Sequence, residues 1–481
     1  MNILVAALMM IPETPVRVGS KHFTEGYLVA EMMALLVEKN GHEVQRIHGL
    51  GGTMVCFEAL KNGAIDMYPE YTGTIAQEIL KSPRPLSEVE MRGELRRRFG
   101  IVMLPSFGFE NTYAIALARA QARALGVSRI SDLAGHPELR GGLSYEFLRR
   151  QDGWPALAAA YGLTQQPAGM EHGLAYDALR AGQIDFTDAY TTDAKIARYD
   201  LVVLEDDRGF FPSYRAVPLL REAQQHLRSA FTPVLGTLDE KAMRALNAAV
   251  EIDGRRFEEV ARSHLAERGL VRDRAGAAPG LAARLARRTA EHLGLTLVAL
   301  VLAVALAVPL GVVAWRAPAF GHAIVAGAGL LQTIPSIALL ALLIPLLGIG
   351  RVPAIVALFV YGLLPIVRNT HAGLAGVEPQ YRTIALAMGL TSWQRLRFVE
   401  LPLAFPVVLA GIKTAAIINI GTATLAAFIG AGGLGEPIVT GLALNDSGMI
   451  LEGALPAAAL ALATELAFRL LERRATDSFS G

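Results

Sequence analysis

Residues 59–74 read ALKNGAIDMYPEYTGT, and residues 178–193 read ALRAGQIDFTDAYTTD. Both segments carry Ala-Leu-basic-x-Gly-x-Ile-Asp, then an apolar residue, then Tyr-Thr at the same offset. The pattern predicts a helix, a glycine turn, a buried strand and a tyrosine-bearing loop that occur twice. Because ligands of open α/β sheets bind beyond the carboxyl ends of strands, we expect Tyr71 and Tyr190 at the mouths of two similar lobes.

The chain before this repeat alternates between strand and helix patterns. Strands are expected at VRVGS, EVQRIHGL and AIDMY, with helices between them. Thr24 stands where a helix N-cap belongs, Glu25 suits the positive end of that helix, and Asn40-Gly41 closes it. These alternations predict βαβ units and two lobes that face each other across a cleft.

The composition excludes several classes of protein. The 481 residues carry a formal net charge of +1, 52% of them are hydrophobic, and Cys56 is the one cysteine. A disulfide scaffold is therefore excluded, and so is a basic nucleic-acid binder, so no nucleic-acid partner is expected. One cysteine leaves the redox compartment open.

The second half of the chain is far more apolar than the first. Between Leu293 and Gly350 the only charged residue is Arg316. A membrane span needs roughly 20 apolar residues, and several runs reach this length. Five spans are predicted, near residues 292–314, 322–347, 352–369, 404–429 and 448–470. The second is long and interrupted by proline, which leaves six spans open.

A cleft walled by tyrosines favours a particular ligand chemistry. A quaternary ammonium ion has no N–H to donate, but the negative faces of aromatic rings attract it by about 0.5 to 2 kcal/mol per ring. Three or four rings supply the roughly 8 kcal/mol of micromolar binding if the cage is preformed. The candidates are Tyr71, Tyr113, Tyr190 and Tyr214. Taken singly, each tyrosine fits ordinary packing better than a ligand cage.

The segments VGSKHFTEGYLVAEMMALLVEKNG, AIDMYPEYTGT, ENTYAI, EFLRRQDGW and TDAYTTD resemble the substrate-binding proteins of osmoprotectant importers for glycine betaine, choline and related compounds. The resemblance covers most of residues 15–270 and implies the two-lobed periplasmic-binding-protein (type II) α/β fold with an aromatic cage. It assigns the cage to the same four tyrosines. It assigns the carboxylate side to Lys21, Thr74 and the Arg of an R-x-D-G motif, which is Arg150 here, although the adjacent Arg149 is an alternative.

Other residues near this motif have simpler interpretations. Pro69 stiffens the turn, and Glu70 and Asp66 are expected to be solvated or capping groups rather than ligands. His22, His42 and His48 are expected to be solvated surface residues.

The membrane half resembles the permease subunits of the same importers and implies an all-α polytopic domain. RTIALAMGLTSWQRLRFVELPLAFPVVLAGIKTA is similar to the cytoplasmic coupling loop of binding-protein-dependent permeases, here residues 378–402. The resemblance assigns ATPase coupling to Ala385, Gly389, Leu401 and Pro402. Thr383-Ile384-Ala385 stands where the family usually has Glu-Ala-Ala, which puts in doubt how strongly the loop grips its ATPase. GTATLAAFIGAGGLGEPI, residues 421–438, is also similar to the permeases.

The domains follow from these assignments. Residues 1–14 are expected to be a degenerate signal or leader and 273–290 a linker. The binding domain is expected at 15–272, with lobe 1 at about 15–110 and 211–272 and lobe 2 at about 111–210; the permease domain is expected at 291–472.

The topology places the binding domain outside the cytosol. A cytosolic coupling loop after the third span puts the chain before the first span on the other side of the membrane. Arg284, Arg287 and Arg288 then lie outside, against the positive-inside tendency. The expected location is the bacterial inner membrane, with the protein in contact with lipid.

The chain has no G-x-x-x-x-G-K-[ST] phosphate loop, so a separate ATPase is expected in trans, with a homodimer of the permease domain and no cofactor or metal. The predicted function is import of a quaternary ammonium solute, not enzymatic catalysis. Alternatives are another betaine such as ergothioneine as the substrate, or a ligand-gated receptor or channel, against which the coupling loop argues. An enzyme has no support, because no H-E-x-x-H or Ser-His-Asp pattern is readable.

Overall fold

The computed structural model describes residues 15–272, 280–444 and 446–477. The expected leader and residues 273–279 of the expected linker lie outside the described residues. The chain divides near residue 278 into two compact units, a binding unit and a membrane unit, which are taken separately below.

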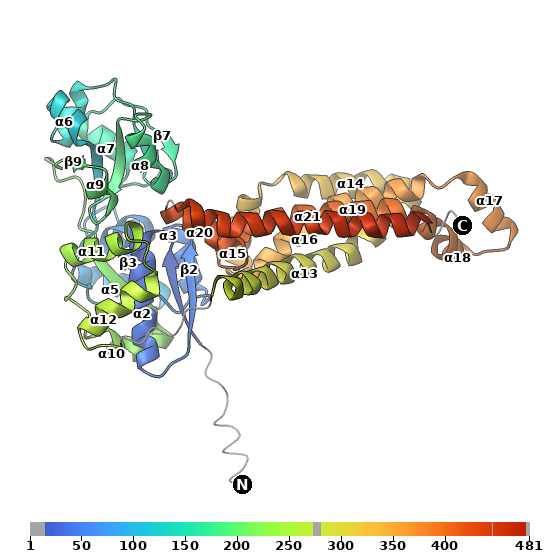
Figure 1. Cartoon of the computed structure of the whole chain (residues 1–481), viewed down its shortest axis with the longest axis horizontal. Helices are drawn as coiled ribbons and strands as arrows, with labels where there is room; N and C mark the ends of the chain where they lie inside the picture. The colour runs from blue at the N-terminus through green and yellow to red at the C-terminus, as the bar shows by residue number, and fades with distance from the viewer. Residues whose placement is uncertain (1–14, 273–279, 445, 478–481) are drawn as a thin grey trace, which may run out of the picture. The chain divides into compact units, whose positions relative to one another are not determined.

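The binding unit begins with a five-stranded sheet of order β2-β1-β3-β10-β4 (Figure 1). Its strands are β1 (Val16–Lys21), β2 (Val44–Leu50), β3 (Met67–Tyr71), β4 (Ile101–Met103) and β10 (Ala216–Arg221). β1 pairs in parallel with β2 and β3, whereas β10 runs antiparallel to β3 and β4. The associated helices are α2 (Thr24–Lys39), α3 (Thr53–Lys61), α5 (Glu88–Phe99), α10 (Arg228–Phe231), α11 (Glu240–Glu251) and α12 (Phe257–Glu267). Since β10 returns from far along the chain, this lobe is built from two separate segments.

The second lobe is formed by the residues between β4 and β10. Its sheet has the order β8-β5-β9, with β5 (Tyr113–Ala118) antiparallel to β8 (Phe186–Tyr190) and β9 (Leu201–Val203). A parallel pair, β6 (Gly142–Ser144) and β7 (Ala168–Met170), is joined to β8 by a bridge from Gly141 to Phe186. Its helices are α6 (Arg119–Leu125), α7 (Trp154–Tyr161), α8 (His172–Arg180) and α9 (Lys195–Arg198). The order of elements in both lobes is that of the two-lobed α/β prediction.

The structure confirms the internal repeat. Helix α3 leads through Gly63 into β3, and helix α8 leads through Gly182 into β8. Both glycines have positive φ, 74° and 67°, a conformation in which a Cβ is strained. Each strand ends on the expected tyrosine, Tyr71 or Tyr190.

The repeat extends to ion pairs that fix the start of each strand. Asp66 accepts hydrogen bonds from the backbone N–H of Arg17 at 2.9 Å and from its Nε at 3.0 Å. Asp185 accepts the same two bonds from Arg140, at 2.8 and 2.9 Å. Asp66 is 2% exposed and is also within 3.5 Å of Arg221. Asp66 is therefore not solvated, but it accepts a backbone N–H as a capping group does, and its buried carboxylate satisfies the neighbouring arginine.

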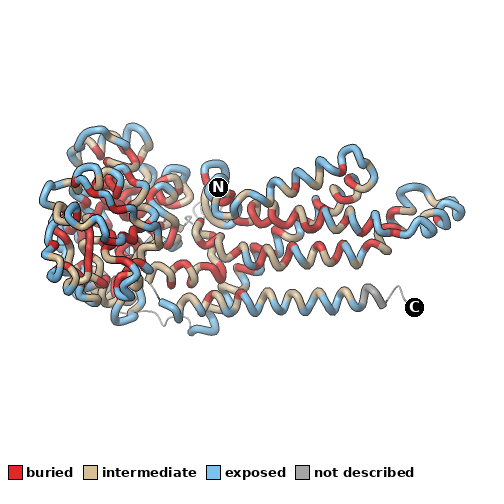
Figure 2. The backbone as a smooth tube through the Cα atoms, turned by 90° about the horizontal axis from the view of Figure 1, so that it is seen from above, coloured by how far each residue is buried: buried red, intermediate tan, exposed pale blue. Residues whose placement is uncertain are grey.

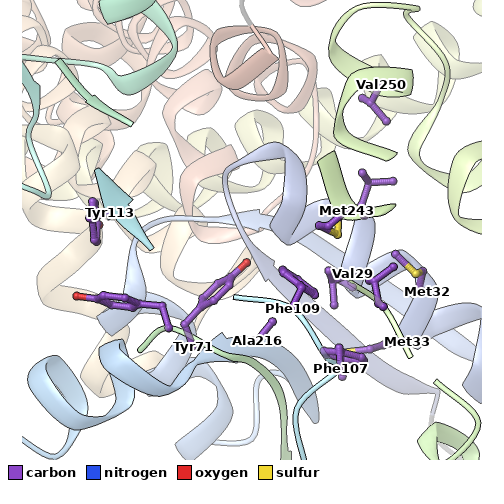
Figure 3. Packing of buried hydrophobic residues seen from close by; sticks show 14 of the residues in the cluster. Val29, Met32, Met33, Tyr71, Phe107, Phe109, Tyr113, Ala216, Met243 and Val250 are labelled. Atoms are coloured by element: carbon purple, nitrogen blue, oxygen red, sulfur yellow. The ribbon is translucent and has the colours of Figure 1, made fainter. Parts of the chain in front are cut away.

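Beside a smaller cluster in the second lobe, buried apolar side chains of both lobes form one large cluster; Figure 2 marks the buried positions along the backbone. Helix α2 contributes Val29, Met32 and Met33 to it, and Tyr71 and Tyr113 belong to the same cluster (Figure 3). Three tyrosines predicted for the ligand cage, Tyr71, Tyr113 and Tyr214, are thus held by the core, which limits their motion.

The membrane unit is all-α in the residues described. Four helical segments are long and apolar enough to cross a membrane, and the five predicted spans are reached if the bent pair of α14 and α15 crosses as one span. Its helices are α13 (Leu281–Arg316), α14 (Pro318–Thr333), α15 (Ser336–Leu347), α16 (Arg351–Ala375), α17 (Pro379–Ala387), α18 (Ser392–Arg395), α19 (Leu401–Ala423), α20 (Gly435–Leu444) and α21 (Ser447–Asp477). Helix α13 begins within the expected linker, so residues 281–290 are helical. Helix α21 has few buried positions (Figure 2).

The predicted proline interruption of the second span is a sharp bend. Helices α14 and α15 meet at 93° across residues 334–335. Pro335 has no N–H to continue the helical bonding, and the Tyr361 hydroxyl donates to the carbonyl of Ile334 that the break leaves free. The bend is thereby tied to α16.

The arginines at the start of α13 are paired within the membrane unit. Glu452 of α21 lies 3.3 Å from Arg284 and 2.8 Å from Arg288, and Glu436 of α20 lies 3.4 Å from Arg288. These carboxylates offset charge that conflicts with the positive-inside tendency. The pairing also joins α13 to the two C-terminal helices.

Candidate ligand-binding cleft and coupling loop

One cavity of about 480 Å³ lies in the binding unit. It brings together all seven residues predicted to bind ligand, which come from both lobes. They are Lys21, Tyr71, Thr74, Tyr113, Arg150, Tyr190 and Tyr214. The volume falls in the range of small-molecule sites, about 300 to 1,000 Å³.

Aromatic rings form a continuous wall of the cavity. The Tyr113 ring centroid lies 5.1 Å from that of Tyr190 and 5.7 Å from that of Tyr214, which meets it edge-on. Phe23 continues the wall, 5.7 Å from Tyr190 and 6.1 Å from Tyr71. The four tyrosines are therefore neighbours in space, and Phe23 is a fifth ring that the tyrosine pattern did not include.

Two of the phenol hydroxyls are anchored in the protein. The Tyr71 hydroxyl donates to Glu25 Oε1 at 2.6 Å, and the Tyr214 hydroxyl donates to Asp152. Burial and the adjacent carboxylate raise the pKa of Tyr71 well above its usual value, so the phenol is neutral. A phenol that donates to a carboxylate is polarised and its ring becomes more electron-rich, which strengthens attraction to a cation.

Glu25 is fully buried and collects four hydrogen-bond donors. Besides Tyr71, it accepts from Asn111 Nδ2 at 2.9 Å, Thr192 Oγ1 at 2.5 Å and Asn247 Nδ2 at 3.3 Å. Burial raises its pKa to about 7, while the four hydrogen bonds favour the charged form and oppose that rise. Thr192 follows β8 of the second lobe, so Glu25 links the two lobes. The expectation that Glu25 serves the positive end of its helix therefore covered only part of its role.

The predicted cationic residue Lys21 is already paired within the protein. Its Nζ lies 2.6 Å from Glu70 Oε1 and 3.4 Å from Thr53 Oγ1. It also lies 5.1 Å from the Tyr71 ring centroid. Glu70 is fully buried, so the expectation that it is solvated was wrong; it orients Lys21 and accepts the backbone N–H of Tyr71 at 2.9 Å.

The structure distinguishes the two adjacent arginines. Arg150 is 5% exposed and donates to both oxygens of Asp152, at 2.7 and 2.6 Å. Its guanidinium lies 5.2 Å from the Tyr113 ring centroid. Arg149 also lines the cavity but is exposed. Because Arg150 is fixed by a bidentate pair, it has the more defined position in the cleft.

His172 is a cavity residue that the sequence reasoning missed. Its ring centroid lies 4.6 Å from that of Tyr190, and its Nε2 lies 3.1 Å from Asp193 Oδ2. Burial lowers its pKa, but Asp188 and Asp193 together outweigh burial and raise it to about 10. His172 is thus a cation at neutral pH, beside a tyrosine of the wall. In the sequence, His172 and Gly173 open the second repeat helix, and no pattern there indicates a ligand-binding histidine.

Carboxylates of both lobes also reach the cavity. Glu146 Oε1 accepts from Thr53 Oγ1 at 3.3 Å, and Glu78 Oε1 accepts from the backbone N–H of Gln151 at 3.3 Å. Each contact joins one lobe to the other. They are candidates for bonds that form and break as the lobes move.

The histidines expected on the surface differ from one another. His22 lines the cavity 3.8 Å from Glu171, and burial lowers its pKa. Burial also lowers the pKa of His48. Both are partly exposed rather than fully solvated. His42 is half-buried and lies 5.8 Å from the ring of His226.

The predicted coupling loop is mostly helical. Helix α17 ends at Ala387 and is followed by Gly389, whose φ is 78°; Ala385 is the one buried position of the helix. A π-helical turn over Leu396–Glu400 then leads into α19, which begins with Leu401 and Pro402. The loop exposes large apolar side chains: Tyr381, Ile384, Leu386, Met388, Trp393 and Phe398. An exposed apolar surface of this kind marks an interaction site.

The fold and the cavity together define a class of protein: a two-lobed α/β solute-binding domain covalently joined to a multi-pass helical membrane domain. The family models agree with both parts. Residues 14–267 match the substrate-binding domain of the ABC-type glycine betaine transport system. Residues 299–477 match the binding-protein-dependent transport system inner membrane component. The chain belongs to the ABC-type glycine betaine transport family, as a fusion of its binding and inner-membrane parts.

The chain is similar to several named proteins. A glycine betaine/carnitine/choline transport system permease protein of Bacillus subtilis is 46% identical over 186 residues, 39% of this chain and 86% of that protein. An ergothioneine transport permease/ergothioneine binding protein of Helicobacter pylori is 33% identical over 282 residues, 56% of this chain and 51% of that protein. The crystal structure of a glycine betaine/carnitine/choline ABC transporter is 28% identical, covers 53% of this chain and 99% of its own, and has a TM-score of 0.46.

Proposed function

We propose that the chain binds a quaternary ammonium solute outside the cytosol and carries it across the inner membrane, powered by a separate ATPase. The observation that carries this proposal is the single cavity in which four tyrosines and the cations Lys21 and Arg150 meet. The family to which the chain belongs is consistent with it. Glycine betaine, choline and related betaines are the proposed substrates.

The proposed binding mode divides the cavity into two poles. The faces of Tyr71, Tyr113, Tyr190 and Tyr214 attract the ammonium group, since they can hold a cation that has no N–H. Lys21, Thr74 and Arg150 bind the carboxylate. The cationic group of Lys21 lies only 5.1 Å from a ring centroid and that of Arg150 5.2 Å, so the two poles are close together. This spacing favours a ligand whose two charges are separated by a short linker.

The proposed transport cycle follows from the two units. Ligand closes the two lobes, and Glu78 and Glu146 are among the groups whose interlobe contacts change. A separate ATPase docks on the coupling loop, where Ala385, Gly389, Leu401 and Pro402 shape the loop and its exposed apolar side chains supply contact area. Two permease domains form the translocation path as a homodimer. ATP hydrolysis then drives alternating access.

The test is calorimetric titration of the full-length chain in lipid nanodiscs with glycine betaine, choline, carnitine and ergothioneine. We expect micromolar or tighter binding of at least one of them. A folded protein that binds none of the four would contradict the proposal. The same titration of Y190A tests one ring of the aromatic wall. Y190F is its matched control, because it keeps the ring and removes only the hydroxyl.

Ergothioneine is the second candidate substrate. The Helicobacter pylori relative that carries it in its name supports this candidate. Its trimethylammonium group suits the same rings, and its imidazole-2-thione is bulkier than any part of glycine betaine. Competition between the two ligands in the same titration assigns the preferred one.

A further inference from the structure

Glu400 lies at the C-terminal end of the coupling loop, on the π-helical turn that precedes α19. Its side chain is fully buried. Arg395 Nε of α18 donates to its Oε1 at 3.1 Å, and Arg382 Nε of α17 lies 3.6 Å from the same oxygen. One carboxylate is thus bonded to both helical limbs of the loop. Burying an unpaired carboxylate has a high desolvation cost. The two arginines offset this cost for Glu400.

Arg382 extends this arrangement to the membrane helices. Its guanidinium donates to the carbonyl of Leu374 at the end of α16, at 2.6 Å. The same group lies 5.0 Å from the ring centroid of Trp315 at the end of α13. Arg316, the next residue of α13, donates to the Ser392 carbonyl of α18 at 2.7 Å. The ends of α13 and α16 and the start of α19 are therefore all bonded to the coupling loop.

We propose that Glu400 is the positioning residue of the coupling loop: by pairing with Arg382 and Arg395 it makes α17, α18 and the start of α19 one rigid body. A push on the exposed face of α17 then moves the ends of α13, α16 and α19 together. That the push comes from an ATPase rests on the proposed function. The rigidity of the loop is independent of the proposed function.

This arrangement bears on the replacement of Glu-Ala-Ala by Thr383-Ile384-Ala385. Position 383 carries no carboxylate, whereas the carboxylate of Glu400, on the opposite limb of the loop, is buried. Glu400 acts through Arg382 and Arg395 and is not itself on the exposed surface. A π-turn at this point is consistent with such a role, since π-bulges often lie at functional sites.

The test compares the mobility of the loop in matched variants of the full-length chain. A spin label is attached at Met388→Cys, a position that is 72% exposed, in a Cys56→Ser background. We expect a more mobile EPR line shape in E400Q, which keeps the side-chain volume, and restoration toward the parent in E400D, which keeps the charge. E378Q, an exposed carboxylate of the same loop, is the control and is expected to keep the parent line shape. If E400Q fails to fold, R395Q replaces it.

The second measurement is betaine uptake in proteoliposomes that also hold the co-purified ATPase. We expect E400Q to bind betaine as the parent does and to lose at least tenfold in uptake. An unchanged line shape in E400Q overturns the proposal, and so does a mobile loop with full uptake. Absence of betaine uptake in the parent would contradict the proposed function instead, and the line shape would still judge Glu400.

Discussion

Two buried carboxylates, Glu25 of the binding unit and Glu400 of the membrane unit, hold separate segments together in different ways. Glu25 accepts hydrogen bonds from four neutral donors. Glu400 is paired with two arginines. Both side chains are almost inaccessible to solvent, so the difference lies in their partners. Neutral donors leave the desolvation cost of the charge partly uncompensated, whereas arginines offset it by opposite charge.

This difference in partners indicates which of the two carboxylates changes its charge with pH. Glu25 has a pKa raised to about 7, so its charge changes within the physiological range. It connects Tyr71 of the ligand cavity to Thr192 of the other lobe, which places a titratable group between ligand and lobe movement. Glu400 instead ties helix ends whose relative positions have to be kept during transport.

The largest expected effect comes from removing the Glu25 carboxyl group. E25A leaves four buried donors without an acceptor, and we expect a loss of about 4 kcal/mol of local stability at roughly 1 kcal/mol for each donor. Hydrogen exchange of α2 peptides in the full-length chain measures this loss of stability. We expect the protection factors to fall by several hundredfold or more. E25Q, which keeps one acceptor oxygen, is expected to lose less. Equal protection of α2 in E25A and the parent would contradict the shared role of these bonds.

The next effect is a pH dependence that Glu25 supplies. Its pKa is raised from 4.5 in the unfolded chain to about 7 in the folded one, so the folded state binds the proton more tightly. The raised pKa therefore adds to the free energy of unfolding. This contribution is present in full below pH 4.5 and is lost as the pH rises through about 7, and it amounts to about 3 kcal/mol at most. The difference in unfolding free energy between parent and E25Q, followed from pH 4.5 to 8, isolates it. A constant difference would mean that Glu25 does not titrate in this range.

The third prediction concerns the aromatic wall. Y190A and Y71A are each expected to weaken binding of the preferred cation by more than about tenfold, or 1.4 kcal/mol. Y190F keeps the ring and should stay close to the parent, whereas Y71F also loses the bond to Glu25 and should show a moderate loss. Calorimetric titration measures all four. Unchanged affinity in both alanine variants would dismiss the aromatic cage.

The smallest effect tests whether Glu400 and Arg395 act as a pair. In a double-mutant cycle of E400Q and R395Q, we expect a coupling energy of about 1 kcal/mol, in the range for contacting residues. Hydrogen exchange of peptides spanning α18 and α19 provides the free energies. Additive effects of the two substitutions would show that the pair does not act as a unit. No such coupling is expected between E400Q and E25Q.

Much of the architecture was predictable because it depends on local patterns. The repeated Ala-Leu-basic-x-Gly-x-Ile-Asp segments specified a helix, a left-handed glycine and a strand, and Gly63 and Gly182 adopt that conformation. Long apolar runs specified the membrane helices, and Pro335 accounts for the bend between α14 and α15. The four tyrosine candidates came from the cation–π argument, and Lys21, Thr74 and Arg150 came from a family resemblance. All seven line one cavity, and their contact with ligand stays a prediction.

The errors arose where a polar residue was judged without its partner. Asp66 and Glu70 were expected to be solvated or capping groups, but both are buried and form ion pairs with Arg17 and Lys21. His172 was overlooked, because only its contact with Tyr190 gives it a place in the cavity.

By itself, the sequence determined the helices, the strands, the membrane spans and the chemical types gathered near the strand ends, since hydrophobic period, glycine and proline act over a few residues. Only the tertiary structure decided which charges are paired, which rings meet, and that Glu25 and Glu400 each join segments far apart in the chain. The physical reason is that the cost of burying a charge depends on donors brought from elsewhere in the chain, and no local pattern encodes them.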